Sequence, residues 1–587
     1  MRRLVIMLLA WPGVAGALAQ LDLDLRLDPA TREFAAKARL ADSAGLRGFR
    51  LAPEFEIVAL SIDGRAARPS RRGAVVTLPR GTRQVDVRYR ATLKPLAALD
   101  HREVLADRSA TAAPEGSFLP AAAGWYPEVG ALFSYRVSLS LPAGQKGLVP
   151  GEIVKESDGA DGYRAEFVFA EPVEGIDLMA GPYVLAEHRL KLPGGHYVKV
   201  RSWFHPELGD LAPAYLDDSA RYLERYSRLI GDYPFAMFSI VSSPTPTGFG
   251  MPTLTYLGRD VLRLPFIRAT SLGHEILHNW WGNGVYPDWP RGNWSEGLTT
   301  FLADYAYKED ESEAAAREMR MGWLRDYAAV PPGEDFALKN FTSRQHGIAS
   351  IIGYNKAAMV FLMLRDRIGK DAFERGLRLF WQRHRFKTAG WAELEAAFGE
   401  ASGQPLADFF RTWVQQSGSP PFAGADPDFR IWRRIDPAVF PPILREVFVA
   451  PEATVVAVGN DAELRAAAQA LAARLLDAKP DAVVTTLPAR GPALIVGKAN
   501  ELDAWLAARQ LPPRPVLKEG SAQVWAGRDG RGRPYVAIAV ADVAALKALM
   551  RPLPHYGKQS WLVFDGARAI ERGIWPPRAE TAASGSR

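Results

Sequence analysis

The sequence HEILH at residues 274–278 has the clearest chemical meaning in the chain. Residues four apart share one face of a helix, so the imidazoles of His274 and His278 can bind the same metal ion. Glu275 lies about 100° further round the helix, and from there its carboxylate can reach a water on that ion. A metal, two neutral imidazoles and a carboxylate base are the parts of a metal-assisted hydrolysis.

A helix must position these side chains, and the surrounding pattern predicts one from Ser271 to Trp281. We expect Thr270 or Ser271 to cap its N-terminus and Gly282 to end it.

A catalytic zinc ion has three protein ligands and keeps a fourth position for water. The chain has no cysteine, so only His, Asp and Glu can supply the third ligand. Glu296 opens the next helical segment, with 17 residues between it and His278. The metzincin pattern needs a histidine at position 284, which is Gly284. We therefore expect His274, His278 and Glu296 to bind one Zn²⁺ and Glu275 to act as the base.

These residues resemble the aminopeptidase N family of zinc metallopeptidases, which belongs to the gluzincin group. The resemblance rests on HEILHNWWGN at 274–283 and WSEGLTTF at 294–301, which are similar to the family's HExxH and NEG motifs. The loop Pro287 to Asn293 makes the spacing to Glu296 one residue shorter than in the family. The resemblance implies a zinc-dependent peptidase, most often an aminopeptidase.

A second segment, Gly-Tyr-Asn-Lys at 353–356, resembles the Tyr-Glu-Lys-Gly segment of the same family. This resemblance implies that Tyr354 donates a hydrogen bond to the oxyanion of the substrate.

The segment from Gly248 to Tyr256 resembles the Gly-x-Met-Glu-Asn strand of the family's exopeptidases, which implies that Gly250 and Met251 bind substrate. Pro252 stands where the family has the glutamate that pairs with the free amine of the substrate. A buried ammonium without a carboxylate partner is costly, so exopeptidase specificity needs another acid. The alternatives are a zinc endopeptidase or another zinc hydrolase, and a non-catalytic peptide-binding protein.

The chain is predicted to be a multidomain α+β protein with three domains after an N-terminal leader. Short alternating strands predict a β-sandwich-like, β-rich domain at residues 20–200. Residues 201–421 have helical periodicity and hold the candidate site, and the resemblance implies that this domain is thermolysin-like. Residues 422–587 alternate strand-like runs with Ala/Leu-rich helices, which predicts a C-terminal α/β domain.

Residues 1–19 combine a basic start, an apolar stretch and the small-residue end Ala-Leu-Ala, which is typical of a signal peptide cleaved after Ala19. Pro12, Gly13 and Gly16 interrupt the apolar stretch. We expect no stable membrane insertion after cleavage and an exported location, in the periplasm or secreted.

The charge balance argues against a nucleic-acid-binding protein. The chain has 72 Lys and Arg against 66 Asp and Glu, a net charge of +6, and its basic residues form no long run. The expected partner is a peptide substrate, and no feature of the sequence fixes the oligomeric state.

Overall fold

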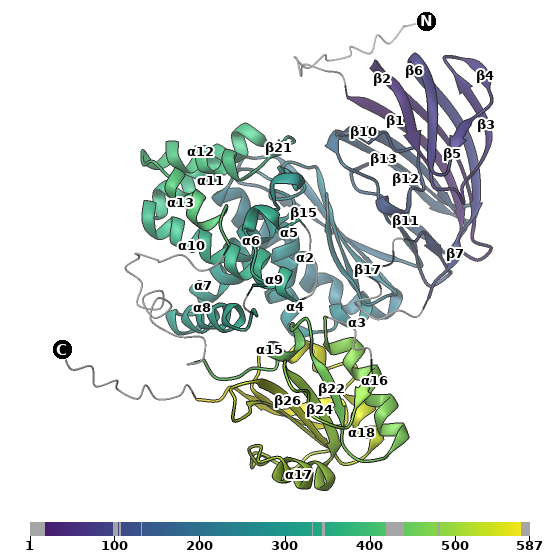
Figure 1. Cartoon of the computed structure of the whole chain (residues 1–587). Helices are drawn as coiled ribbons and strands as arrows, with labels where there is room; N and C mark the ends of the chain where they lie inside the picture. The colour runs from purple at the N-terminus through teal and green to yellow at the C-terminus, as the bar shows by residue number, and fades with distance from the viewer. Residues whose placement is uncertain are drawn as a thin grey trace, which may run out of the picture. The chain divides into compact units, whose positions relative to one another are not determined.

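The computed structural model is shown in Figure 1, coloured along the chain. Its contacts divide the chain into two compact units, one of residues 1–286 with 378–388 and one of residues 287–377 with 389–587. The expected signal peptide lies outside the described residues up to residue 17, and so does the expected boundary at residue 421. The domain boundaries therefore stay predictions. The structure describes residues 18–97, 104, 107, 109–130, 132–331, 333–342, 347–417, 440–477 and 482–576.

A nine-stranded sheet with the order β12-β13-β10-β1-β2-β6-β3-β4, and β5 beside β6, begins the first unit. β1 (Ala19–Asp28) pairs parallel with β10 and antiparallel with β2, and its residues alternate between buried and exposed as the period of two predicts. The other strands are β2 (Glu33–Arg50), β3 (Glu56–Ile62), β4 (Arg65–Ala67), β5 (Ser70–Arg72), β6 (Val75–Thr92), β10 (Phe133–Leu141), β12 (Glu152–Gly159) and β13 (Gly162–Val173).

A second sheet with the order β11-β14-β9-β8-β7 shares its core with the first. Leu119, Leu148 and Met179 of this sheet and Leu23 of β1 belong to one cluster of buried side chains. The N-terminal part is therefore β-rich, as predicted. The strands are β7 (Lys94–Pro95), β8 (Thr111–Ala112), β9 (Ser117–Leu119), β11 (Lys146–Leu148) and β14 (Leu178–Gly181).

A mixed five-stranded sheet with the order β15-β16-β17-β19-β18 follows in the same unit. β16, β17 and β19 are parallel, while β15 and β18 pair antiparallel at the two edges. All seven residues of β17 are buried, as in a strand that is covered on both faces. The strands are β15 (Val184–Lys191), β16 (Tyr197–Phe204), β17 (Met237–Ser243), β18 (Gly248–Met251) and β19 (Leu254–Gly258).

The helices of the first unit include the HEILH helix, α5, which is shorter than the sequence predicts. α5 covers Ser271–Leu277, and Gly282 lies well past its end. Thr270 is the N-cap residue, as expected, but its side chain makes no capping bond, because its hydroxyl donates to the carbonyl of Phe266 at 2.8 Å. α5 packs against α2 (Ala212–Leu229) and α4 (Pro265–Ala269), which replace the missing local signals.

The second unit begins with the helices that follow the HEILH segment. Helical backbone runs through Glu296 to Lys308 and through Lys356 to Arg367, in keeping with the helical periodicity of this region. The first run contains the π-helical segment η4, and the second adjoins the π-helical segment η6. The elements are α6 (Ser295–Thr300), η4 (Phe301–Tyr305), α7 (Ala306–Glu311), α8 (Glu313–Ala328), α9 (Ile348–Ser350), η6 (Ile351–Lys356), α10 (Ala357–Ile368), α12 (Trp391–Ser402) and α13 (Ala407–Trp413).

One stretch of the described chain, Ile348–Ile368, is long and apolar enough to cross a membrane by length and composition. It consists of α9, η6 and α10, and most of it is buried inside the structure. This is the profile of a core helix.

The C-terminal part is an α/β domain, as predicted. Its sheet has the order β23-β22-β24-β26-β25-β27-β28, parallel from β23 to β26 and antiparallel beyond. One core cluster includes α15, α16 and α18, and a second includes α17. The elements are α15 (Arg445–Phe448), β22 (Thr454–Ala457), α16 (Ala462–Leu475), β23 (Val483–Val484), β24 (Ala493–Lys498), α17 (Ala499–Ala508), β25 (Ala522–Arg528), β26 (Pro534–Val540), α18 (Val543–Ala548), β27 (Trp561–Asp565) and β28 (Arg568–Gly573).

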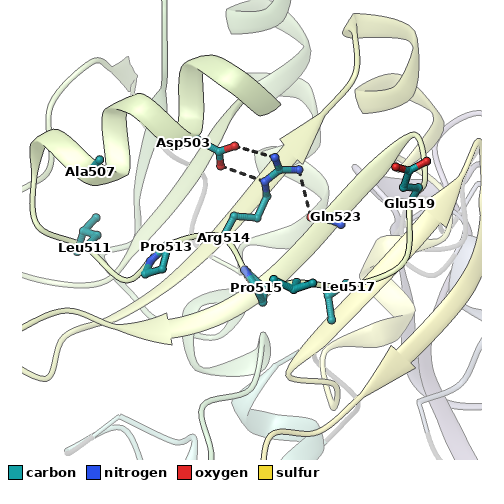
Figure 2. Close-up of a pocket in the computed structure, with 10 residues that line it drawn as sticks. Asp503, Ala507, Leu511, Pro513, Arg514, Pro515, Leu517, Glu519 and Gln523 are labelled. Carbon is teal, nitrogen blue, oxygen red and sulfur yellow. Dashed lines mark hydrogen bonds and ion pairs between the residues drawn. The ribbon is translucent and has the colours of Figure 1, made fainter.

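An open cavity of about 590 Å³ lies in this domain, beside α17 and the segment 511–519 (Figure 2). Arg514 points into it and forms a bidentate pair with Asp503, with distances of 3.0 and 2.6 Å. A further nitrogen of Arg514 donates to Gln523 at 3.4 Å. The charge of Arg514 is thus neutralised within the domain, and no residue of the HEILH segment lines the cavity.

The pKa of Asp177 gives a first prediction. Burial raises this pKa to about 6, against one hydrogen bond from the N–H of Ala121 at 2.8 Å. The folded state holds the proton more tightly than the unfolded state, so this stabilisation is present below pH 4 and is lost as the pH rises through 6. Asp177→Asn should therefore gain about a few °C in Tm relative to wild type between pH 4.5 and 7.5.

The matched control for this pH series is Asp22→Asn on the exposed face of β1. This substitution removes a carboxylate from the exposed face and no buried one. A difference in Tm between Asp177→Asn and wild type that does not change with pH would contradict the assignment.

Candidate metal centre

The two histidines of HEILH share the less buried face of α5. His274, Glu275 and His278 are partly exposed, whereas Leu272 and Ile276 on the opposite face are fully buried. The N–H of His278 donates to the carbonyl of His274 at 3.3 Å, so the turn between them closes although α5 ends at residue 277. The two imidazole rings lie 4.9 Å apart. One helical turn thus presents both nitrogens to one point.

Glu296 completes the group. One potential ligand atom from each of His274, His278 and Glu296 lies within 4.8 Å of the others. Among the described residues, this is the group of His, Cys, Asp or Glu side chains that could hold a metal ion. The spacing with one residue fewer than the family's therefore still brings Glu296 to the histidines.

The tautomer of His278 is fixed by a backbone carbonyl. Its Nδ1 lies 2.8 Å from the carbonyl oxygen of Trp281, which can only accept. Nδ1 therefore carries the proton, and the lone pair remains on Nε2, the nitrogen that is available for a metal.

The close packing of Gly297 against α10 positions α6, the helix that carries Glu296. A Cβ at Gly297 would lie 2.2 Å from the Cβ of Ala357, so only glycine lets α6 approach α10 this closely. The preceding turn is fixed by Asn293, whose Oδ1 accepts from the N–H of Ser295 at 2.9 Å and from its hydroxyl at 2.7 Å.

The edge strand β18 lies against Glu275. A Cβ built on Gly250 would meet Glu275 Oε2 at 2.4 Å and His278 Cδ2 at 3.4 Å. Position 250 is therefore a side-chain position that faces the candidate base, while Pro252 lies past the end of the strand, in its turn. Neither position carries a carboxylate.

Asn279 is a positioning residue that the sequence reasoning missed, although it directly follows HEILH. This fully buried amide accepts at Oδ1 from the N–H of Thr253 at 2.8 Å and donates to the carbonyl of Ile276 at 3.0 Å. Thr253 has a left-handed φ of 65°, which is uncommon for a β-branched residue. The bond from Thr253 thus ties the strained turn of the β18–β19 hairpin to the end of α5.

Tyr354 lies in the π-helical segment η6, which packs against α6. Its side chain is partly exposed and meets the ring of Phe341 edge-on, with 6.1 Å between ring centroids. Gly353 allows this approach, because a Cβ there would lie 2.2 Å from Phe341 Cζ. The structure thus places Tyr354 on the neighbour of the helix that carries Glu296.

The arrangement of HEILH on one helix, with a glutamate from the following helix, resembles that of gluzincin-type metallopeptidases. Residues 268–413 match the model of the Peptidase family M1 domain. This part of the chain is therefore similar to the catalytic domain of the aminopeptidase N family.

Named relatives agree with this assignment. Human glutamyl aminopeptidase is 30% identical over 162 residues, which cover 26% of this chain and 16% of the human protein. Aminopeptidase N of Caulobacter vibrioides is 27% identical over 279 residues, 43% of this chain and 31% of that protein. The chain thus matches less than a third of the length of these relatives.

The fold extends further than the sequence match. The crystal structure of an M1 zinc metallopeptidase from Deinococcus radiodurans, in a mutant form bound to a Tyr-Ser-Ala substrate, covers 69% of this chain and 95% of its own. The TM-score is 0.55 at 19% sequence identity, so this likeness concerns the fold.

The contact between β18 and Glu275 gives a second prediction. Gly250→Ala places a methyl group at the Glu275 carboxylate and should lower the rate of peptide hydrolysis about tenfold, because a misplaced base loses its alignment. The control is Gly248→Ala on the same strand, whose Cβ would meet only Leu257 Cδ2, at 3.6 Å. The rates of both variants are measured at saturating substrate. Equal rates for Gly250→Ala and Gly248→Ala would show that β18 does not constrain Glu275.

Proposed function

We propose that the chain is a zinc-dependent peptidase in which His274, His278 and Glu296 hold one Zn²⁺ ion. The observation that carries this proposal is the grouping of these three ligand atoms within 4.8 Å, inside a match to the Peptidase family M1 domain. The substrate is a peptide, in keeping with the peptidase family.

The donor set fits zinc. Two imidazole nitrogens and one carboxylate oxygen are a ligand set of catalytic zinc sites. These three residues would hold the ion, which would supply Lewis-acid chemistry there. The absence of cysteine from the chain leaves these harder ligands as the available set.

When bound, zinc lowers the pKa of a water to about 7 and polarises a carbonyl group. Glu275, which like both histidines lies on the partly exposed side of α5, accepts the proton of the attacking water and passes it to the leaving amine. Tyr354 donates its hydroxyl proton in a hydrogen bond to the oxygen of the former carbonyl as negative charge develops there. β18, an edge strand next to Glu275, supports an extended substrate by backbone pairing.

Aminopeptidase action is the subtype that the relatives support, since glutamyl aminopeptidase and aminopeptidase N are among them. A specific observation favours a second subtype, a zinc endopeptidase or another zinc hydrolase. The side-chain position on β18 that faces Glu275 is Gly250, and Pro252 follows the strand, so neither supplies a carboxylate for a substrate amine.

We also propose export to the periplasm or the medium. The signal-peptide pattern at residues 1–19 and the absence of cysteine support this proposal. β1 pairs with both of its neighbours from Gln20 onward, so cleavage after Ala19 would remove only the first residue of the strand and its pair with Phe133.

Substitution of the base separates chemistry from metal binding. Glu275→Gln should lower turnover by roughly 10²–10⁴-fold or more, because the amide cannot accept the proton, while zinc stays bound. Glu296→Gln should instead lose zinc, because a neutral amide is a weaker ligand. Metal content per chain and initial rates on a peptide substrate measure both effects.

The control for these variants is Glu224→Gln on α2, where Glu224 pairs with Arg228 at the surface. It should keep both zinc and activity. Wild-type turnover in Glu275→Gln would remove this residue from the mechanism.

The missing carboxylate sets the expected selectivity for the N-terminus. We expect acetylation of the substrate amine to lower the rate of hydrolysis by less than about tenfold, because no charged partner faces the amine from β18. Pairs of free and acetylated peptides, each with and without a chelator, measure this ratio. Mass spectrometry of the products separates removal of single N-terminal residues from internal cleavage. A loss of more than about a hundredfold would show that another acid binds the amine.

A further inference from the structure

Asp326, near the end of α8, is a fully buried carboxylate that receives groups from two domains. Asn355 Nδ2 of η6 donates to its Oδ2 at 2.9 Å. Arg445 Nε lies 3.1 Å from Oδ1, and Lys558 Nζ lies 3.5 Å from Oδ2. A buried carboxylate is costly unless it is paired, and here two cations and one amide face it.

The C-terminal domain positions both cations. Arg445 is the first residue of α15, and its backbone N–H donates to the carbonyl of Gly557 at 2.9 Å. The N–H of Leu444 donates to the carbonyl of Gln559 at 2.9 Å, so α15 is fastened on both sides of Lys558. Leu444 also lies in the core of the C-terminal domain. The fold of this domain therefore determines where the charges meet Asp326.

Asn355, which donates to Asp326, is the residue that directly follows Tyr354 in the chain. Asn355 lies in η6, and a π-helical segment is less stable than an α-helix and needs support from outside. Lys356 is buried and pairs with Asp335 at 3.2 Å, and Asp335 also accepts from the hydroxyl of Tyr327 at 2.8 Å. Two carboxylates thus hold the two residues that follow Tyr354.

A second contact from the C-terminal domain lies at the start of the same helical stretch. Gly347 has a left-handed φ of 80°, and a Cβ there would lie 1.4 Å from Asp477 Oδ2. Glycine at this position leaves room for Asp477, which follows α16. The C-terminal domain therefore lies against this segment at Gly347 and meets it at Asn355 only through Asp326.

We propose that the C-terminal α/β domain positions the oxyanion donor Tyr354, through the contact of Arg445 and Lys558 with Asp326 and of Asp326 with Asn355. This inference rests on the proposed function, in which Tyr354 acts on the substrate oxygen. Asp326, Asn355 and Arg445 are positioning residues, since they act on the substrate only through Tyr354. The domain is thus part of the catalytic apparatus and does not only stabilise the fold.

A double-mutant cycle on the zinc-loaded full chain tests the proposal. Arg445→Met should lower kcat about 10- to 100-fold with KM changed less than about twofold, because a misplaced donor weakens the transition state more than the bound substrate. In the Tyr354→Phe background, Arg445→Met should lower kcat by less than about twofold, because the hydroxyl that Arg445 helps to position is gone. Arg445→Lys, which keeps the charge, should recover part of kcat.

The matched control is Arg528→Met. Arg528 has the same side-chain exposure as Arg445, 21%, and pairs with the partly buried Glu446 at 2.8 Å inside the C-terminal domain. It should leave the effect of Tyr354→Phe unchanged. Lys558→Met, at a more exposed position, is a milder second variant and should give a smaller loss of kcat that also vanishes without the Tyr354 hydroxyl.

Hydrogen exchange of the amides of residues 351–356 gives a readout that does not need turnover. Protection should fall in Arg445→Met and not in Arg528→Met. The proposal would be overturned if Arg445→Met lowered kcat equally with and without the Tyr354 hydroxyl. It would also be overturned if Arg445→Met left the hydrogen exchange of residues 351–356 unchanged. A wild-type chain that binds zinc and cleaves no peptide would instead overturn the proposed function.

Discussion

The site depends on one backbone hydrogen bond, from the N–H of His278 to the carbonyl of His274. This bond closes the turn that places both imidazoles on one side of α5. A helix of seven residues is too short to be stable alone, so tertiary contacts must hold it. Its apolar face is fully buried, and the hydroxyl of Tyr226 on α2 donates to the carbonyl of Gly273 at 3.0 Å. The relative position of the two imidazoles is therefore a property of the packing around α5.

Irregular backbone recurs at the other positions that the chemistry needs. α6, which carries Glu296, continues into the π-helical segment η4, and Tyr354 lies in the π-helical segment η6. The turn after β18 contains the left-handed Thr253. Such segments are less favourable than regular structure and persist where the surroundings impose them, which occurs often at functional sites. Here buried polar groups supply the constraint, with Asn279 at the hairpin and Asp326 at η6.

The sequence was sufficient for the parts of this protein that depend on local spacing. The pattern of HEILH and Glu296 leads to the three residues that the fold brings together, and the period of two leads to β1. The length of α5 could not be obtained in this way, because its end is determined by packing on α2 and α4 and not by Gly282. The direction of Gly250 also depends on how β18 meets α5. The pairing of Asp326 with Arg445 joins residues more than a hundred positions apart, for which a single sequence carries no signal.

The shared carboxylate Asp326 has a thermodynamic consequence for the protein as a whole. Coupling between two parts of a molecule is reciprocal, so the free energy that the C-terminal domain contributes to the arrangement of η6 equals the free energy that η6 contributes to the docking of that domain. A ligand that binds only the ordered form of η6 would therefore also resist undocking of the C-terminal domain, with no contact to it. Under the proposed role of Tyr354, stability and turnover would both report on the pairing of Asp326 with Arg445.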